Sequence, residues 1–69
     1  MPILRLGSRG PDVKLLQSLL ARIGYNPGAI DGIFGNQTQQ AVAEFQRDNG
    51  LVPDGVVGLA TWNILQRFL

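Results

Sequence analysis

Apolar residues recur at helical spacing in three separate stretches of the chain. The first stretch covers residues 11–23, and its apolar stripe consists of Val13, Leu16, Leu20 and Ile23. Gln17 is among the polar residues that lie outside this stripe. A period of three to four residues is typical of an amphipathic helix with one face against a core. The pattern therefore predicts a helix over 11–23.

The ends of this first helix carry the residues that helix termini prefer. Ser8 or Gly10 can serve as the N-cap, and Pro11 suits the first helical position. Asp12 favours the positive end of the helix dipole. Gly24 can adopt the left-handed conformation that ends many helices.

Two further helices follow. Residues 36–49 bury Thr38, Ala41, Val42 and Phe45 on one side of the second helix. Residues 59–68 form the third helix, with Trp62, Leu65 and Phe68 near one face. No segment shows the sustained alternation of a half-buried strand, although residues 1–6 and 51–57 can run extended over the helices. The sequence therefore predicts an all-α fold, a small three-helix bundle within a single domain over 1–69.

A loop and the helix after it occur twice. The sequence DGIFGNQT over residues 31–38 matches DGVVGLAT over 54–61, 23 residues further along. The apolar face of the helix repeats with the loop, since Phe45 falls on Phe68 at the same offset. The duplication predicts two copies of one loop-helix unit.

The repeated residues have a structural interpretation. An Asp side chain accepts amide hydrogen bonds from residues just ahead, and the following Gly takes a positive φ that turns the chain. The second Gly of each unit then starts a helix, and the Thr hydroxyl bonds back to that turn. This predicted turn motif comprises Asp31, Gly32, Gly35 and Thr38, repeated as Asp54, Gly55, Gly58 and Thr61.

A catalytic or calcium-binding role for Asp31 and Asp54 is the alternative interpretation of the motif. The structural role is favoured, because an EF-hand loop needs alternating oxygen ligands and a distal Glu that this sequence lacks. The units differ in one respect. Six residues separate Gly24 from Asp31, whereas three separate Gly50 from Asp54. The first loop has spare length that a ligand site can use.

Composition narrows the possible functions. The 69 residues include 45% hydrophobic residues and neither cysteine nor histidine, which removes disulfides, thiolate nucleophiles and imidazole bases. We therefore expect no catalytic residue, no metal site and no cofactor. Six scattered basic residues give a net charge of +1, which argues against nucleic acid. No apolar run is long enough to span a membrane, no signal peptide is visible, and we expect a monomer.

The sequence resembles a known family, the bacterial peptidoglycan-binding domains found beside amidases, lytic transglycosylases and spore-cortex hydrolases. The resemblance covers nearly the whole chain. It rests on Gly10-Pro11-Asp12-Val13 with Leu16-Gln17, Gly24-Tyr25, both Asp-Gly motifs, Ala41-Val42, Phe45-Gln46, Gly50-Leu51, Thr61 and Trp62. The prodomains of matrix metalloproteinases look similar in fold, but they carry a cysteine that this chain lacks.

The resemblance implies a three-helix fold, an extracellular or cell-envelope location and a wall-anchoring role. The export signal is not in this chain. We therefore expect a non-catalytic module that binds peptidoglycan, through its glycan strand or its stem peptide, and anchors a fused catalytic domain. An enzyme is a weaker hypothesis, because no hydroxyl has a base beside it in the sequence. The remaining alternative is a protein-interaction or prodomain-like module, which would bind a polypeptide in the groove that we otherwise expect to bind peptidoglycan.

The longer first loop and the start of the second helix are the expected ligand groove. A receptor for peptidoglycan should combine an apolar or aromatic wall with amide donors and a guanidinium. The candidate ligand-binding residues are Tyr25, Asn26, Ile30, Phe34, Gln37, Gln40, Arg47 and Trp62.

Each candidate also has a purely structural interpretation. Core packing is favoured for Phe34 and Trp62, whose helical or loop neighbours are apolar. Tyr25 can either pack over the first helix or offer its hydroxyl to a ligand. A solvated role is favoured for Arg47, and it remains equally open for the glutamines.

Overall fold

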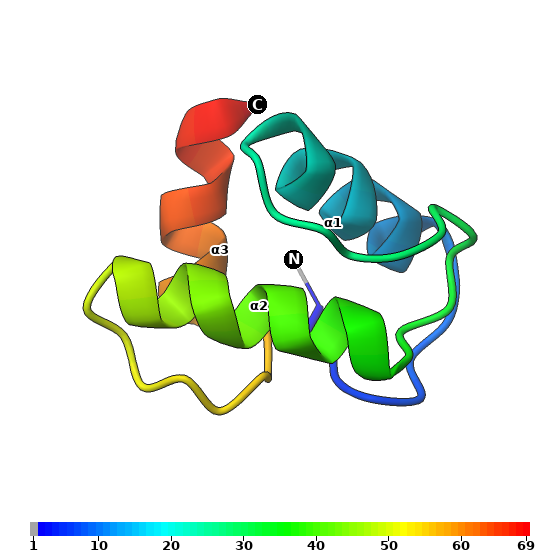
Figure 1. The fold of residues 1–69 in the computed structure, drawn as a ribbon, viewed down its shortest axis with the longest axis horizontal. Helices are drawn as coiled ribbons and strands as arrows, with labels where there is room; N and C mark the ends of the chain where they lie inside the picture. The colour runs from blue at the N-terminus through cyan, green and yellow to red at the C-terminus, as the bar shows by residue number, and fades with distance from the viewer. Residues whose placement is uncertain (1) are drawn as a thin grey trace.

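The structure is a computed structural model that describes residues 2–69. Residue 1, part of the segment expected to run extended, lies outside the described residues. The helices are α1 (Pro11–Arg22), α2 (Asn36–Asp48) and α3 (Leu59–Leu65), and one 3-10 turn, η1 (Gln66–Phe68), follows α3 (Figure 1). The predicted all-α fold with three helices is confirmed.

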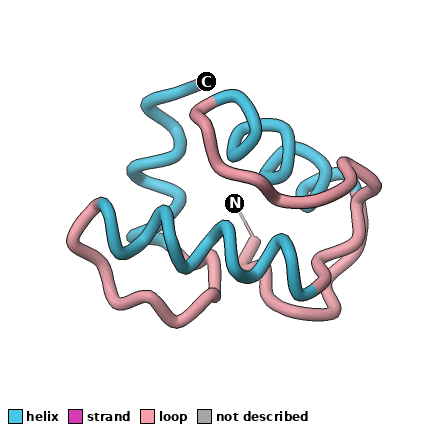
Figure 2. The backbone as a smooth tube through the Cα atoms, viewed as in Figure 1, coloured by secondary structure: helices cyan, strands magenta, loops and turns pink. Residues whose placement is uncertain are grey.

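Loops make up the rest of the described chain (Figure 2). Within residues 2–69 the only β-type pairing consists of two isolated antiparallel bridges, Leu4 with Val57 and Arg9 with Ile33. No helix in that range has the length and apolar character needed to cross a membrane.

The predicted helix ends agree closely with the structure. Pro11 stands in the first turn of α1, and Gly10 is its N-cap. Gly10 has no side chain, so no side-chain hydrogen bond caps the helix. The hydroxyl of Ser8, the other N-cap candidate, accepts a hydrogen bond from the backbone N–H of Arg5 at 3.0 Å. Gly24 has a positive φ of 101° just after the helix, as expected. Proline and glycine therefore set both ends of α1.

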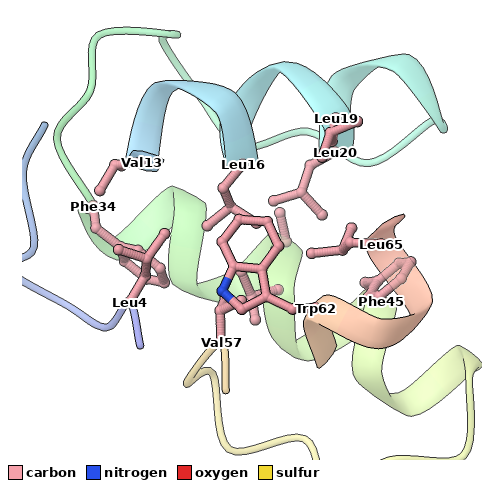
Figure 3. Close-up of a cluster of buried hydrophobic side chains, with 12 residues drawn as sticks. Leu4, Val13, Leu16, Leu19, Leu20, Phe34, Phe45, Val57, Trp62 and Leu65 are labelled. Carbon is pink, nitrogen blue, oxygen red and sulfur yellow. The ribbon is translucent and has the colours of Figure 1, made fainter. Parts of the chain in front are cut away.

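The core lies between the three helices. Its side chains come from α1, α2, α3, Phe34, Val57 and the N-terminal segment, and Figure 3 shows Trp62 in the middle of this cluster. The Trp62 indole N–H donates to the carbonyl of Pro2 at 2.8 Å. Burying each such side chain contributes roughly 1.5–3 kcal/mol. Each helix depends on this shared core, because isolated helices shorter than about 12–15 residues are only marginally stable in water.

The third helix differs from its prediction. The α-helix ends at Leu65 rather than Phe68, and the last turn tightens to 3-10. Phe68 is 41% exposed, while its repeat counterpart Phe45 is 1% exposed. The equivalence inferred from the sequence repeat is therefore wrong for Phe68, because the tightened turn carries its ring away from the core.

The N-terminal segment joins the two repeated loops. Leu4 and Val57 exchange two backbone hydrogen bonds at 3.0 and 2.8 Å. The backbone N–H groups of Gly10 and Phe34 donate to Gly32 and Ser8 at 3.0 and 2.9 Å. Both repeated loops are thus hydrogen-bonded to the N-terminal segment, which we call the N-terminal strap. This pairing fixes the positions of the two loops beside which the candidate site lies.

Candidate functional site

In each repeated loop the chain turns at the Asp-Gly pair, as predicted. Oδ1 of Asp31 accepts a hydrogen bond from the N–H of Ile33 at 2.9 Å, and Gly32 has a φ of 77°. Oδ1 of Asp54 accepts from the N–H of Val56 at 2.9 Å, and Gly55 has a φ of 74°. A left-handed φ is strained for residues with a Cβ, so glycine is the residue that fits.

The pKa of Asp31 is lowered from its ordinary value. The main cause is the hydrogen bond from the backbone N–H of Ile33, and the amide of Gln17 adds to it. Donors to the ionised carboxylate favour the charged form. Asp31 is therefore held as a carboxylate by the turn itself, and no cluster of three or more potential metal ligands occurs among residues 2–69.

A buried glutamine on α1 organises the first loop. Nε2 of Gln17 lies within 3.3 Å of Asp31 Oδ1, 2.9 Å of the Ile33 carbonyl and 3.1 Å of Thr38 Oγ1. Its Oε1 accepts the N–H of Gly32 at 2.9 Å. One side chain thus bonds to three of the four motif residues, Asp31, Gly32 and Thr38. The expectation that Gln17 lies on the polar face of α1 is wrong, because its amide finds all its partners inside the fold.

Gln46 on α2 repeats this arrangement in the second loop. Its Nε2 lies 3.1 Å from Asp54 Oδ1, 2.9 Å from the Val56 carbonyl and 3.1 Å from Thr61 Oγ1. Its Oε1 accepts the N–H of Gly55 at 2.9 Å. The repeat thus extends to the preceding helix, and each helix holds the loop that leads into the next one.

The motif threonines do not bond back to the turn, contrary to the prediction. No helix N-cap in residues 2–69 has a side-chain hydrogen bond, although Gly35 and Gly58 occupy the N-cap positions as expected. Thr38 and Thr61 are buried and accept hydrogen bonds from the two glutamines instead. The two hydroxyls are therefore bonded to glutamines of the preceding helices and not to the turn amides.

A small pocket lies beside the first loop. We call it the first-loop pocket, and its volume is about 180 Å³. It includes the stretch from Pro27 to Ala29 and Gln37 among its lining residues. Thr38 Oγ1 donates to the Pro27 carbonyl at 2.8 Å, and Gln37 Nε2 donates to the Asn26 carbonyl at 3.1 Å. The extra length of the first loop thus folds back over the motif and leaves little space.

A larger pocket occupies the corresponding place beside the second loop. This second-loop pocket has a volume of about 480 Å³. Its lining residues Asp54, Val56, Gly58, Leu59, Ala60 and Thr61 are the repeat counterparts of residues that line the first-loop pocket. Residues 50–52, which correspond to 27–29, also line this pocket, but no described hydrogen bond from Thr61 draws them over the motif in the way that Thr38 holds Pro27. The site that stays open is therefore the one that the sequence did not predict.

Two aromatic side chains predicted to contact the ligand are buried in the core. Phe34 is 1% exposed and Trp62 is 2% exposed, and both belong to the core. Their assignment as ligand-binding side chains is wrong for this structure, and the core interpretation is the one that holds. Both residues lie where apolar faces meet, which gives their rings more contact inside the fold than a surface groove offers.

Tyr25 is half-buried and already has a partner. Its hydroxyl donates to Asp48 Oδ2 at 2.6 Å, and its ring meets Phe45 edge to face with centroids 5.6 Å apart. The hydrogen bond to Asp48 is the main reason that the pKa of Tyr25 is raised to about 12. The hydroxyl expected to meet a ligand is thus bonded within the fold.

The other predicted residues are exposed but spread over the surface. Gln37 lines the first-loop pocket, while Asn26 and Ile30 lie on the loop around it. Gln40 and Arg47 are exposed on α2 and line neither pocket. The structure therefore brings only part of the predicted set together, and a ligand role for these exposed residues remains a prediction.

Comparisons with known proteins place this architecture in context. The sequence pattern of the family described as "Putative peptidoglycan binding domain" matches residues 9–65. The N-acetylmuramoyl-L-alanine amidase CwlM of Mycobacterium tuberculosis is 44% identical over 52 residues, which cover 75% of this chain and 13% of the amidase. A spore cortex-lytic enzyme of Bacillus cereus is 40% identical over 63 residues, which cover 91% of this chain and 24% of that enzyme.

A solved structure shares the fold. The crystal structure of a peptidoglycan-binding protein from Clostridioides difficile, in complex with glutamine hydroxamate, matches with a TM-score of 0.91 at 44% identity. The match covers 96% of this chain and 41% of that chain. This chain thus spans less than two thirds of the length of each of these three proteins.

Proposed function

We propose, from the premise that this chain belongs to the peptidoglycan-binding domain family, that it is a non-catalytic module that binds peptidoglycan and anchors a fused domain to the bacterial cell wall. The family and the fold expected from the sequence resemblance are confirmed by the match over residues 9–65 and by the solved structure. The absence of catalysis, the ligand and the fused partner are parts of the proposal.

One contrast supports this proposal. The polar side chains of the turn motifs are all hydrogen-bonded within the fold, whereas the second-loop pocket is open and mainly apolar. Asp31, Asp54 and the motif threonines are bonded to the two glutamines and to nearby backbone. Within residues 2–69 no buried side-chain nitrogen or oxygen lacks a hydrogen-bond partner. Groups held in this way stiffen a receptor, whereas a catalytic acid or base needs a reacting partner within hydrogen-bond reach.

The relatives support the proposed role of an anchor. The amidase and the spore cortex-lytic enzyme are several times longer than the segment that they share with this chain. A tethered domain stays at high local concentration near the polymer, so modest affinity is sufficient. We propose accordingly that the module acts as a monomer at the cell wall or in the envelope.

Retention on purified cell-wall sacculi tests the proposal. The chain should sediment with sacculi that have been stripped of protein by detergent and protease, and it should release no soluble muropeptide during the incubation. Release of muropeptides would overturn the non-catalytic role. Retention on untreated sacculi that disappears after stripping would favour the alternative, in which the ligand is a polypeptide.

A further inference from the structure

The second-loop pocket is an apolar cavity whose rim is exposed. Ile3, Val52 and Leu59 line it and are 59, 75 and 78% exposed. A volume of about 480 Å³ falls within the roughly 300–1,000 Å³ that is typical of small-ligand sites. Large aliphatic side chains gathered at one open cavity indicate a binding surface, whereas single exposed apolar residues do not.

The walls of this pocket are aliphatic. Among residues 2–69 no aromatic residue lines it: Phe34, Phe45 and Trp62 are buried in the core, and Tyr25 and Phe68 are absent from the lining. Sugar rings are commonly bound by stacking on exposed aromatic faces, which offer a flat apolar surface. Branched aliphatic walls suit methyl groups, which alanine side chains and sugar N-acetyl groups both carry, so the choice of ligand depends on the missing aromatic face and on the charge at the rim. The shape and chemistry therefore favour a peptide over a glycan strand.

Arg5 gives the pocket a positive charge at its edge. It is the only cationic residue that lines the pocket among residues 2–69, and no described hydrogen bond or ion pair involves its guanidinium. Its backbone is fixed, because its N–H donates to Ser8 and the adjacent Leu4 pairs with Val57. A guanidinium binds a carboxylate through two parallel hydrogen bonds.

Asp54, the other charged residue in the lining, is held in the turn through one of its two carboxylate oxygens. Its Oδ1 accepts hydrogen bonds from Val56 and Gln46. Arg5 is the lining group that can pair with an anionic ligand, although Asp54 keeps its own negative charge in the same lining. The complementary ligand group is an anion beside short aliphatic chains.

We propose that the second-loop pocket binds the carboxyl-terminal end of the peptidoglycan stem peptide, with alanine methyl groups against the aliphatic walls and the terminal carboxylate on Arg5. This inference rests on the proposed function and deepens it by choosing the peptide over the sugar. The stem peptide supplies both required features, since it is rich in alanine and ends in a free carboxylate.

A titration with defined fragments tests this assignment. The probes are diacetyl-L-lysyl-D-alanyl-D-alanine, the same peptide with a carboxyl-terminal amide, and chitotetraose as a sugar probe. NMR amide shifts are recorded for each. The free acid should shift residues around 50–60, with the amide binding about tenfold more weakly, because it loses a charge-assisted pair. Raised salt should also weaken binding of the free acid.

Paired variants locate the contact. Arg5→Gln should weaken the free acid about tenfold and abolish the difference between acid and amide. Arg9→Gln is the matched control, since Arg9 is exposed on the same segment but lines neither pocket. Leu59→Asn introduces the residue found at the equivalent first-loop position and should also weaken binding. Leu6→Asn is the control for an exposed apolar residue outside both pockets.

The failures of this inference and of the proposed function are distinguishable. Equal binding of acid and amide, shifts confined to the first-loop pocket, or binding of chitotetraose alone would overturn the inference. If sacculi still retain the chain in any of these cases, the proposed function stands. Loss of retention on stripped sacculi would overturn the proposed function itself. If the second-loop pocket is the binding site, Gln37→Ala, which alters only the first-loop pocket, should leave sacculus retention unchanged.

Discussion

The two loop units share one frame and differ in what fills it. In both units a buried glutamine bonds to the Asp, the Gly, a carbonyl and the Thr of the following loop. In the first unit the longer loop folds back onto Thr38, and in the second the space stays open beside Thr61. The shared motif therefore describes how the loops are held. The proposed binding at the second loop depends on the residues that differ between the units.

This contrast shows how a duplicated unit can separate stability from binding. Gln17 ties α1 to the first loop, and Gln46 ties α2 to the second. Because each loop is held by the same contacts, the pocket beside one copy can shrink without loss of the fold. Both copies pair with the N-terminal strap, and the second also borders the larger pocket.

Loss of either glutamine should cause the largest effect. Gln17→Ala and Gln46→Ala each leave several buried polar groups without a partner, and we expect each to lower the free energy of unfolding by about 3 kcal/mol. Urea denaturation followed by circular dichroism measures this. Gln40→Ala, an exposed position on α2, is the control and should change stability by less than about 0.5 kcal/mol. Equal stability of all three variants would refute the shared frame.

The two motif glycines should respond unequally to a side chain. Gly32→Val and Gly55→Val both impose a strained positive φ, which costs about 2 kcal/mol. A Cβ at Gly32 meets the rigid backbone oxygen of Gly10 at 3.2 Å, whereas at Gly55 it meets the flexible side chain of Gln39 at 2.8 Å. We therefore expect Gly32→Val to have the lower melting temperature.

Gly58→Ala provides the reference for the glycine variants. Its φ is −105°, and an added Cβ meets no atom within 4 Å. Its melting temperature should stay close to that of the parent chain. A destabilisation of Gly58→Ala as large as that of Gly32→Val would count against the turn geometry as the cause.

The difference between Thr38 and Thr61 should be smaller. Both lose a hydrogen bond from a glutamine when changed to Val, but Thr38→Val also leaves the Pro27 carbonyl without its donor. We expect Thr38→Val to be less stable than Thr61→Val by about 1 kcal/mol, the usual net value of one hydrogen bond. Chemical denaturation of the two variants side by side measures the difference. The same stability in both would mean that the fold-back of the first loop is not held by this bond.

The helices, the core and the Asp-Gly turns were predictable because they leave local patterns. Helical periodicity places Val13 and Val42 inside, and a glycine after aspartate indicates a turn at Gly32 and Gly55. The role of Gln17 was not predicted, because a lone polar residue beside an apolar stripe resembles a solvated one. Its partners stand 14 to 21 residues away. The Leu16-Gln17 and Phe45-Gln46 pairs were the sequence signal for the buried role of the two glutamines. Each glutamine follows a buried residue and precedes one Asp-Gly turn.

The candidate pocket was predictable only in part. The duplicated motif located both loops, and the spare length of the first loop suggested a groove there. That length instead fills the groove, since the Pro27 carbonyl is the acceptor for Thr38. The tertiary path of a loop decides this outcome, and no local pattern encodes it. Arg5 was likewise not identified, because its approach to the second loop depends on the pairing of Leu4 with Val57.

The smallest effect concerns the one tyrosine, which lies outside both pockets. The hydrogen bond to Asp48 raises the pKa of Tyr25 from 10.0 to about 12, so the folded state favours the protonated phenol. The stabilisation is therefore complete below pH 10 and is lost as the pH rises toward 12. Absorbance of tyrosinate near 295 nm gives this pKa directly, since the chain has a single tyrosine. Asp48→Asn should move the titration back toward pH 10, and an unshifted midpoint in the parent chain would show that the hydroxyl is free for a ligand after all.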